Sequence, residues 1–131
     1  MKQKKVQPPT PPVEFRLFLS TKLDEREKKY KTLIELQTVQ EFSNFRYKIV
    51  VQDTVEENIL RLNIHGLHAP QPILPGTGVA VFRKEYPELT GVKEIIVKKI
   101  DGKENLFSVD ITRKGISVKK IPEEKFVELI V

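Results

Sequence analysis

The stretch NILRLNI, residues 58–64, decides the fold because apolar and polar side chains alternate along it. Leu60, Leu62 and Ile64 share one parity, and the polar residues between them share the other. Successive side chains of a β-strand point to opposite faces of a sheet, whereas those on one face of a helix recur at every third or fourth residue. The stretch therefore predicts a strand that buries one face and exposes the other, as in an antiparallel sheet.

The same alternation recurs in segments spread over most of the chain. Residues 105–111 (NLFSVDI) repeat it, and they predict a strand whose buried face carries Phe107, Val109 and Ile111. Turn-forming residues separate these segments, and the Asp-Gly pair at 101–102 favours a tight hairpin turn. The predicted strands cover residues 13–19, 30–41, 45–53, 58–65, 79–83, 92–100, 105–112, 116–121 and 126–131.

Eight or nine short strands at regular spacing predict an all-β fold. The first choice is an antiparallel β-sandwich of the immunoglobulin-like type, and the alternative is a small β-barrel. The first choice rests on strand spacing alone, because the chain lacks the cysteine pair and the tryptophan of antibody domains. Residues 22–31 are charged and rich in helix formers, so they predict a charged turn or one short helix. A helix that continues through Leu33, Ile34, Leu36 and Val39 is the alternative to the strand at residues 30–41.

The length of 131 residues predicts one folded domain with a tail before it. Residues 1–12 are basic and rich in proline, which favours a flexible or extended tail, and residues 13–131 form the single β domain. The lack of cysteine excludes disulfides, thiolate metal sites and thiol nucleophiles. No signal-peptide pattern or membrane-length apolar run is found, so we expect a soluble, cytoplasmic protein.

The net charge of +5 raises the question of nucleic-acid binding. Residues 1–12 carry three of these positive charges, and acidic and basic residues intermix in the remainder. A nucleic-acid-binding domain more often has a basic surface on one side. Arg46, Lys48 and Arg61 share the predicted hairpin of residues 45–65 and would form such a surface, so a weak nucleic-acid-binding β domain is the alternative function.

The sequence contains no strong signal for catalysis or for a cofactor. His65 and His68 are three residues apart, which places them on opposite faces of a strand, so we expect no metal site. The glycine-containing stretch at 75–78 leads into a predicted strand and not into the helix that a phosphate-binding loop requires. We expect no cofactor, and an enzyme or small-ligand binder with a site scattered in sequence is the third choice.

The proline-stiffened loop at residues 69–74 is the strongest predicted site of recognition. Its apolar residues would either cap the core or contact a partner, and the predicted partner-binding residues are Pro70, Pro72, Ile73 and Leu74. The leading hypothesis is a non-catalytic interaction or scaffold module. Such a module would bind another protein through loops or by strand addition at a sheet edge.

Overall fold

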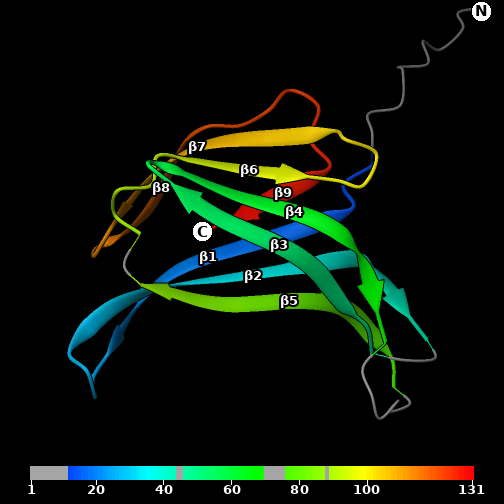
Figure 1. The fold of residues 1–131 in the computed structure, drawn as a ribbon, viewed down its shortest axis with the longest axis horizontal. Coiled ribbons are helices and arrows are strands. Elements are labelled where there is room, and N and C mark those ends of the chain that lie inside the picture. Colours follow the sequence, from blue (N-terminus) through cyan, green and yellow to red (C-terminus); the bar gives the residue numbers. More distant parts are fainter. Residues whose placement is uncertain (1–11, 44–45, 70–75, 88) are drawn as a thin grey trace, which may run out of the picture.

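The computed structural model describes residues 12–43, 46–69, 76–87 and 89–131, and within these ranges the chain is all-β (Figure 1). The strands form one continuous sheet in the order β8-β7-β6-β4-β3-β5-β2-β1-β9. They are β1 (Phe15–Asp24), β2 (Lys29–Phe42), β3 (Lys48–Glu56), β4 (Ile59–His68), β5 (Gly78–Pro87), β6 (Glu94–Lys98), β7 (Glu104–Thr112), β8 (Gly115–Lys120) and β9 (Val127–Ile130).

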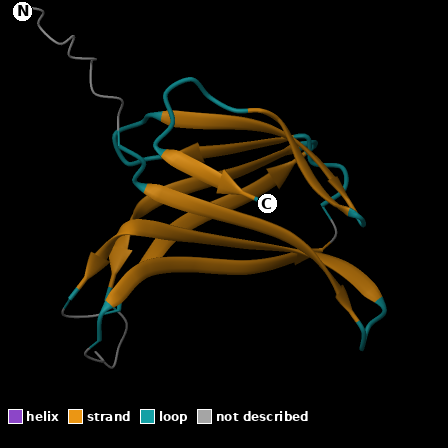
Figure 2. Cartoon of the chain, turned by 180° about the vertical axis from the view of Figure 1, so that it is seen from behind, coloured by secondary structure: helices purple, strands orange, loops and turns teal. Residues whose placement is uncertain are grey.

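The sheet curls into a half-barrel, so that β6 and β7 lie opposite β1 and β2 (Figures 1 and 2). This shape fits the predicted alternative of a small barrel. The immunoglobulin-like sandwich is not confirmed, because a sandwich requires two separate sheets. Here the five strands from β8 to β3 are joined to the four strands from β5 to β9 by one ladder pair, Lys48 with Val81.

The short helix considered near residues 22–31 is wrong, because β1 and β2 continue through this region as a long hairpin. The two strands form ten antiparallel residue pairs, and residues 25–28 make the turn. Asp24 Oδ1 accepts hydrogen bonds from the amides of Arg26 and Glu27, and Lys28 adopts a left-handed φ of 56°. Strand pairing over the length of the hairpin outweighs the local helix propensity of these residues.

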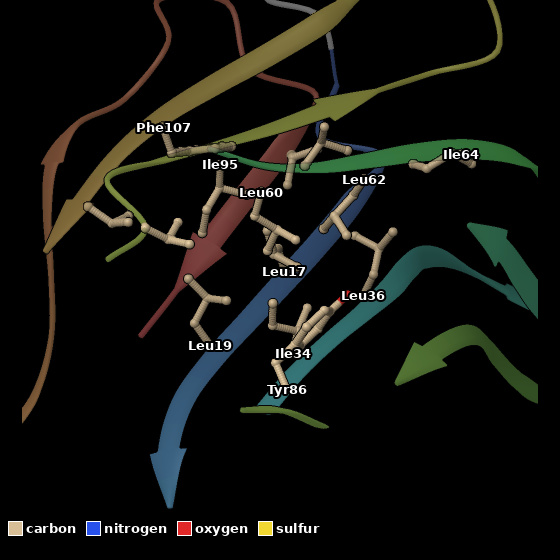
Figure 3. Close-up of a cluster of buried hydrophobic side chains, with 14 of the residues drawn as sticks. Leu17, Leu19, Ile34, Leu36, Leu60, Leu62, Ile64, Tyr86, Ile95 and Phe107 are labelled. Carbon is tan, nitrogen blue, oxygen red and sulfur yellow. The ribbon is translucent and has the colours of Figure 1, made fainter. Parts of the chain in front are cut away.

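The core lies between the two halves of the curled sheet (Figure 3). The residues predicted to be buried are all in it and are each at most 6% exposed: Leu60, Leu62, Ile64, Phe107, Val109 and Ile111. Figure 3 shows side chains from the two halves packing against one another across this space. They come from Leu17, Leu19, Ile34, Leu36 and Tyr86 on one side and from Leu60, Leu62, Ile64, Ile95 and Phe107 on the other.

The side chain of a buried asparagine joins β7, near one end of the strand order, to the start of β9 at the other end. Asn105 of β7 is 2% exposed, and its Oδ1 accepts hydrogen bonds from the amides of Phe126 (2.8 Å) and Val127 (3.1 Å). Its Nδ2 donates to the carbonyl oxygens of Glu104 (3.2 Å) and Glu124 (3.1 Å). A buried polar side chain is stabilising when its hydrogen-bonding groups are satisfied, as they are here.

We predict that Asn105→Ala lowers the free energy of unfolding by about 2–4 kcal/mol, because it leaves two buried backbone amides without their acceptor. Urea denaturation of the two proteins measures this difference. The matched control is Asn63→Ala on the outer face of β4, where the side chain is partly exposed and hydrogen-bonds to no described residue. We expect the control to change stability by less than about 0.5 kcal/mol. Equal effects of the two substitutions would show that Asn105 does not fasten the sheet.

Candidate functional site at the split between β3 and β5

The strands β3 and β5 are neighbours in the sheet, but they separate almost at once. Their ladder contains one pair, Lys48 with Val81, and the Val81 amide donates to the Tyr47 carbonyl at 3.4 Å. Beyond this pair the two strands diverge, as Figure 1 shows. Residues 49–56 of β3 and 82–87 of β5 therefore have no ladder partner on their facing sides within the described part of the chain. We call these two facing edges the split.

The ladders on both sides of the split are irregular near its closed end. The β3–β4 ladder shifts register between Val50 and Val51, so that His65 is an extra residue, and Gly66 beside it has a φ of +143°. The β2–β5 ladder also shifts register, between residues 37 and 41 of β2. A β-bulge increases the local twist of its strand pair. The sheet is therefore irregular on both sides of the point where β3 and β5 separate.

A groove of about 790 Å³ lies at the closed end of the split. It is mostly apolar, and aromatic and β-branched side chains supply much of its lining. Three basic side chains from β3, β5 and the residues before β3 also line it. We call it the cationic groove, and its lining residues are Arg46, Tyr47, Lys48, Ile49, Thr77, Gly78, Val79, Val81, Phe82 and Arg83.

The three basic side chains of the cationic groove differ in their partners. Arg83 Nη1 lies 3.2 Å from Glu35 Oε1 on the neighbouring strand β2. Arg46 and Lys48 are exposed, and neither forms an ion pair with an acidic side chain in the described part of the chain. The groove therefore carries uncompensated positive charge where β3 begins.

One carboxylate crosses the split. Asp53 Oδ2 of β3 accepts hydrogen bonds from Lys84 Nζ and from the Tyr86 hydroxyl of β5, both at 2.7 Å. Lys84 Nζ also lies 5.0 Å from the centre of the Tyr86 ring. These contacts join the two walls through side chains at a level where the backbone ladder has ended.

Near neutral pH, Asp53 and Tyr86 each keep one protonation state, because the pKa values of both groups are shifted away from neutrality. Burial acts to raise the pKa of Asp53, but the hydrogen bonds from Lys84 and Tyr86 outweigh burial and hold that pKa below its usual range. Burial, together with the hydrogen bond to Asp53, raises the pKa of the Tyr86 hydroxyl. The carboxylate thus stays ionised and the hydroxyl keeps its proton, so the bridge acts as a clamp between the walls.

The structure brings together two of the three residues predicted for nucleic-acid binding. Arg46 and Lys48 both line the cationic groove. Arg61 does not, because it pairs with Thr54 near the other end of β3. Sequence reasoning missed Arg83, which joins the groove only because β5 lies beside β3. The alternation did predict a strand at residues 79–83, but nothing local indicates which strand lies next to it.

The residues predicted to bind a protein partner, Pro70, Pro72, Ile73 and Leu74, lie outside the described residues. The two histidines are described. His65 Nε2 lies 3.3 Å from Gln52 Oε1, and His68 pairs with Lys48 in the β3–β4 ladder. Among the described residues, no three histidine, cysteine or acidic side chains gather in a way that could hold a metal ion.

Comparisons with known proteins give no information about the function of this site. No protein-family model matches the chain, and neither a curated protein nor a solved structure matches it significantly. The described part of the chain contains no helix of the length and apolarity needed to span a membrane. The strongest observation is therefore the split itself, with its open strand edges and the cationic groove at its closed end.

We predict that Asp53→Asn lowers the free energy of unfolding at pH 7 by about 1–3 kcal/mol, because it weakens hydrogen bonds made to a charged acceptor. The pKa of Asp53 is lower in the folded state than its ordinary value of 3.8, so its contribution is fully present above about pH 4. It is lost as the pH falls through the folded-state pKa. The difference between the two proteins should therefore shrink in acid.

Urea denaturation of both proteins from pH 7 down to about pH 2 measures this difference. The control is Asp110→Asn, which removes a more exposed carboxylate 3.6 Å from Lys93 Nζ on the outer side of β7. We expect it to change stability at pH 7 by less than about 1 kcal/mol. A stability difference for Asp53→Asn that is the same at both ends of the pH range would contradict the role of the ionised bridge.

Proposed function

We propose that this chain is a non-catalytic interaction module that binds another protein by strand addition at the split. An extended segment of the partner would pair with the open edge of β3, of β5, or of both. The observation that carries the proposal is the single ladder pair between these two strands. Unpaired backbone amides and carbonyls along a strand form a ready template for another strand, and many peptide-binding domains use this mode of recognition.

The length of the open edges supports the split over the two outer edges of the sheet. Residues 49–56 of β3 lack a described partner on one side, whereas β9 has four residues and β8 has six. The outer strand β8 also ends in Lys119 and Lys120, and lysine is a common protection against edge pairing. The first residue of β9 already donates its amide to Asn105.

Exposed apolar side chains along β3 also support a protein partner. Val50 and Val55 are 43% and 44% exposed, although both belong to a strand of the sheet. A partner strand would cover part of this apolar surface while its backbone completes the ladder. The remaining expectations from the sequence do not depend on strand addition at the split. The immunoglobulin-like arrangement, the cytoplasmic location and the contact through Ile73 and Leu74 remain separate proposals.

Selection from a random peptide library displayed on phage, followed by nuclear magnetic resonance, tests this proposal. We expect the selected peptides to shift the backbone amide signals of residues 49–56 and 82–87 more than those of the β6–β8 strands. Methylation of alternate backbone amides in a selected peptide removes ladder donors. Methylation of one set of alternate amides should abolish binding, and methylation of the other set should have little effect if only one edge is used.

The two methylated forms of one peptide have the same side chains, so each serves as a control for the other. Loss of binding with both forms would indicate a strand paired on its two sides, with β3 and β5 at once. Strand addition would be refuted if the selected peptides bind equally well in every methylated form. It would also be refuted if their signals map away from the split.

A further inference from the structure

We infer that the segment recognised at the split carries acidic residues where it lies against the cationic groove, and that they alternate there with apolar residues. Its carboxylates would lie beside Arg46, Lys48 and Arg83 on the outer side of the sheet. Its apolar side chains would point toward the core. This inference rests on the proposed function, and it adds the chemistry of the partner to the mode of binding.

The side chains on the two faces of β3 and β5 determine which residues of an added strand would be polar and which apolar. Lys48 and Val81 are paired, so their side chains leave the same face of the sheet, and Arg83 lies two residues farther along that face. Val51 and Phe82 have the opposite parity and pack against the buried core. A strand added between or beside these walls adopts the same pleat. At the closed end of the split, its outward residues would therefore lie near Lys48 and Arg83, and its inward residues near Val51 and Phe82. Farther along, the outward side chains include Gln52 and Thr54 of β3 and Glu85 of β5, so the basic side chains act only on the end of the segment that lies in the groove.

The positive charge of the cationic groove favours acidic residues at the outward positions of the bound segment. Arg46 and Lys48 have no acidic partner among the described residues, and Arg83 Nη1 has Glu35 at 3.2 Å. Directly opposed side chains on neighbouring strands have Cβ atoms about 4.5–5.5 Å apart, and pairs of opposite charge at this distance are favourable. Acidic residues in the added segment would supply the missing negative charge. A basic segment would be rejected for the same reason.

The same basic residues would also suit the phosphates of a nucleic acid, but the surrounding surface favours a peptide. The walls of the split offer backbone donors and acceptors at the spacing of a β-ladder, which a peptide backbone matches. Arg61, the third basic residue of the predicted nucleic-acid surface, lies away from the groove, opposite Thr54. Oligonucleotide binding is accordingly an outcome that the experiment must separate from peptide binding.

The test compares the affinity of the selected peptides for three forms of the chain. We expect the peptides to alternate acidic and apolar residues at the end that lies in the cationic groove, and the double variant Arg46→Glu, Lys48→Glu to weaken their binding by about tenfold or more. The control is Lys119→Glu, Lys120→Glu at the end of β8, which changes the net charge by the same amount and should alter affinity less than about twofold. Circular dichroism of each variant checks that the fold is retained.

A charge-swapped peptide, with lysine in place of each acidic residue, completes the test. It should bind the natural chain poorly and regain affinity for the Arg46→Glu, Lys48→Glu variant. If the acidic peptides bind all three forms equally but still lose affinity when their amides are methylated, the inference on charge fails and strand addition stands. If no selected peptide binds at the split, both fail.

Fluorescence anisotropy with single-stranded oligothymidylate gives the remaining comparison. We expect this probe to bind more weakly than the selected peptides at the same salt concentration. If it binds more tightly than they do, and if the Arg46→Glu, Lys48→Glu variant loses that binding, the groove recognises nucleic acid. That result would overturn the acidic peptide as its ligand.

Discussion

The curled sheet depends on the hydrogen bonds that the Asn105 side chain makes to the segment entering β9. An open sheet of nine strands has two distant edges, and its core is enclosed only if the halves are held together. Asn105 joins β7 to Phe126 and Val127, and the Phe126 carbonyl in turn accepts hydrogen bonds from the amides of Glu14 and Phe15 at the start of β1. Side-chain and backbone groups thus connect the two ends of the strand order around the buried side chains.

The two junctions between the halves of the sheet are therefore built differently. On one side, the Asn105 amide and the segment before β9 make a dense set of hydrogen bonds in a buried place. On the other side, β3 and β5 share one ladder pair and the Asp53 bridge. The firm junction holds the core together, so the loose one can leave strand edges open without exposing Leu36 or Leu62. Because the Asn105 junction holds the two halves together, the domain can fold although the facing edges of β3 and β5 lack ladder hydrogen bonds.

The sequence predicted most strands and the buried face of several, because alternation is a local property that each segment carries in itself. Leu62 and Phe107 were placed in the core for this reason, and both are fully buried. The parallel pairing of β4 with β6, and the separation of β3 from β5, were not predictable, because register between distant strands has no local signature. Residues 22–31 show the opposite error, since a strong local propensity gave way to the pairing of β1 with β2.

The parallel pairing of β1 with β9 also affects the order in which the chain can fold. Hairpins such as β1–β2 and β3–β4 bring together residues that are close in sequence, so they can form early. The partner of β1 on its other side is the last described strand, and Phe15 must find Val127 across most of the chain. During synthesis, one edge of β1 therefore stays uncovered until β9 has left the ribosome. An uncovered strand edge is prone to aggregation, so a chaperone that binds the edge of β1 during this interval would protect the nascent chain.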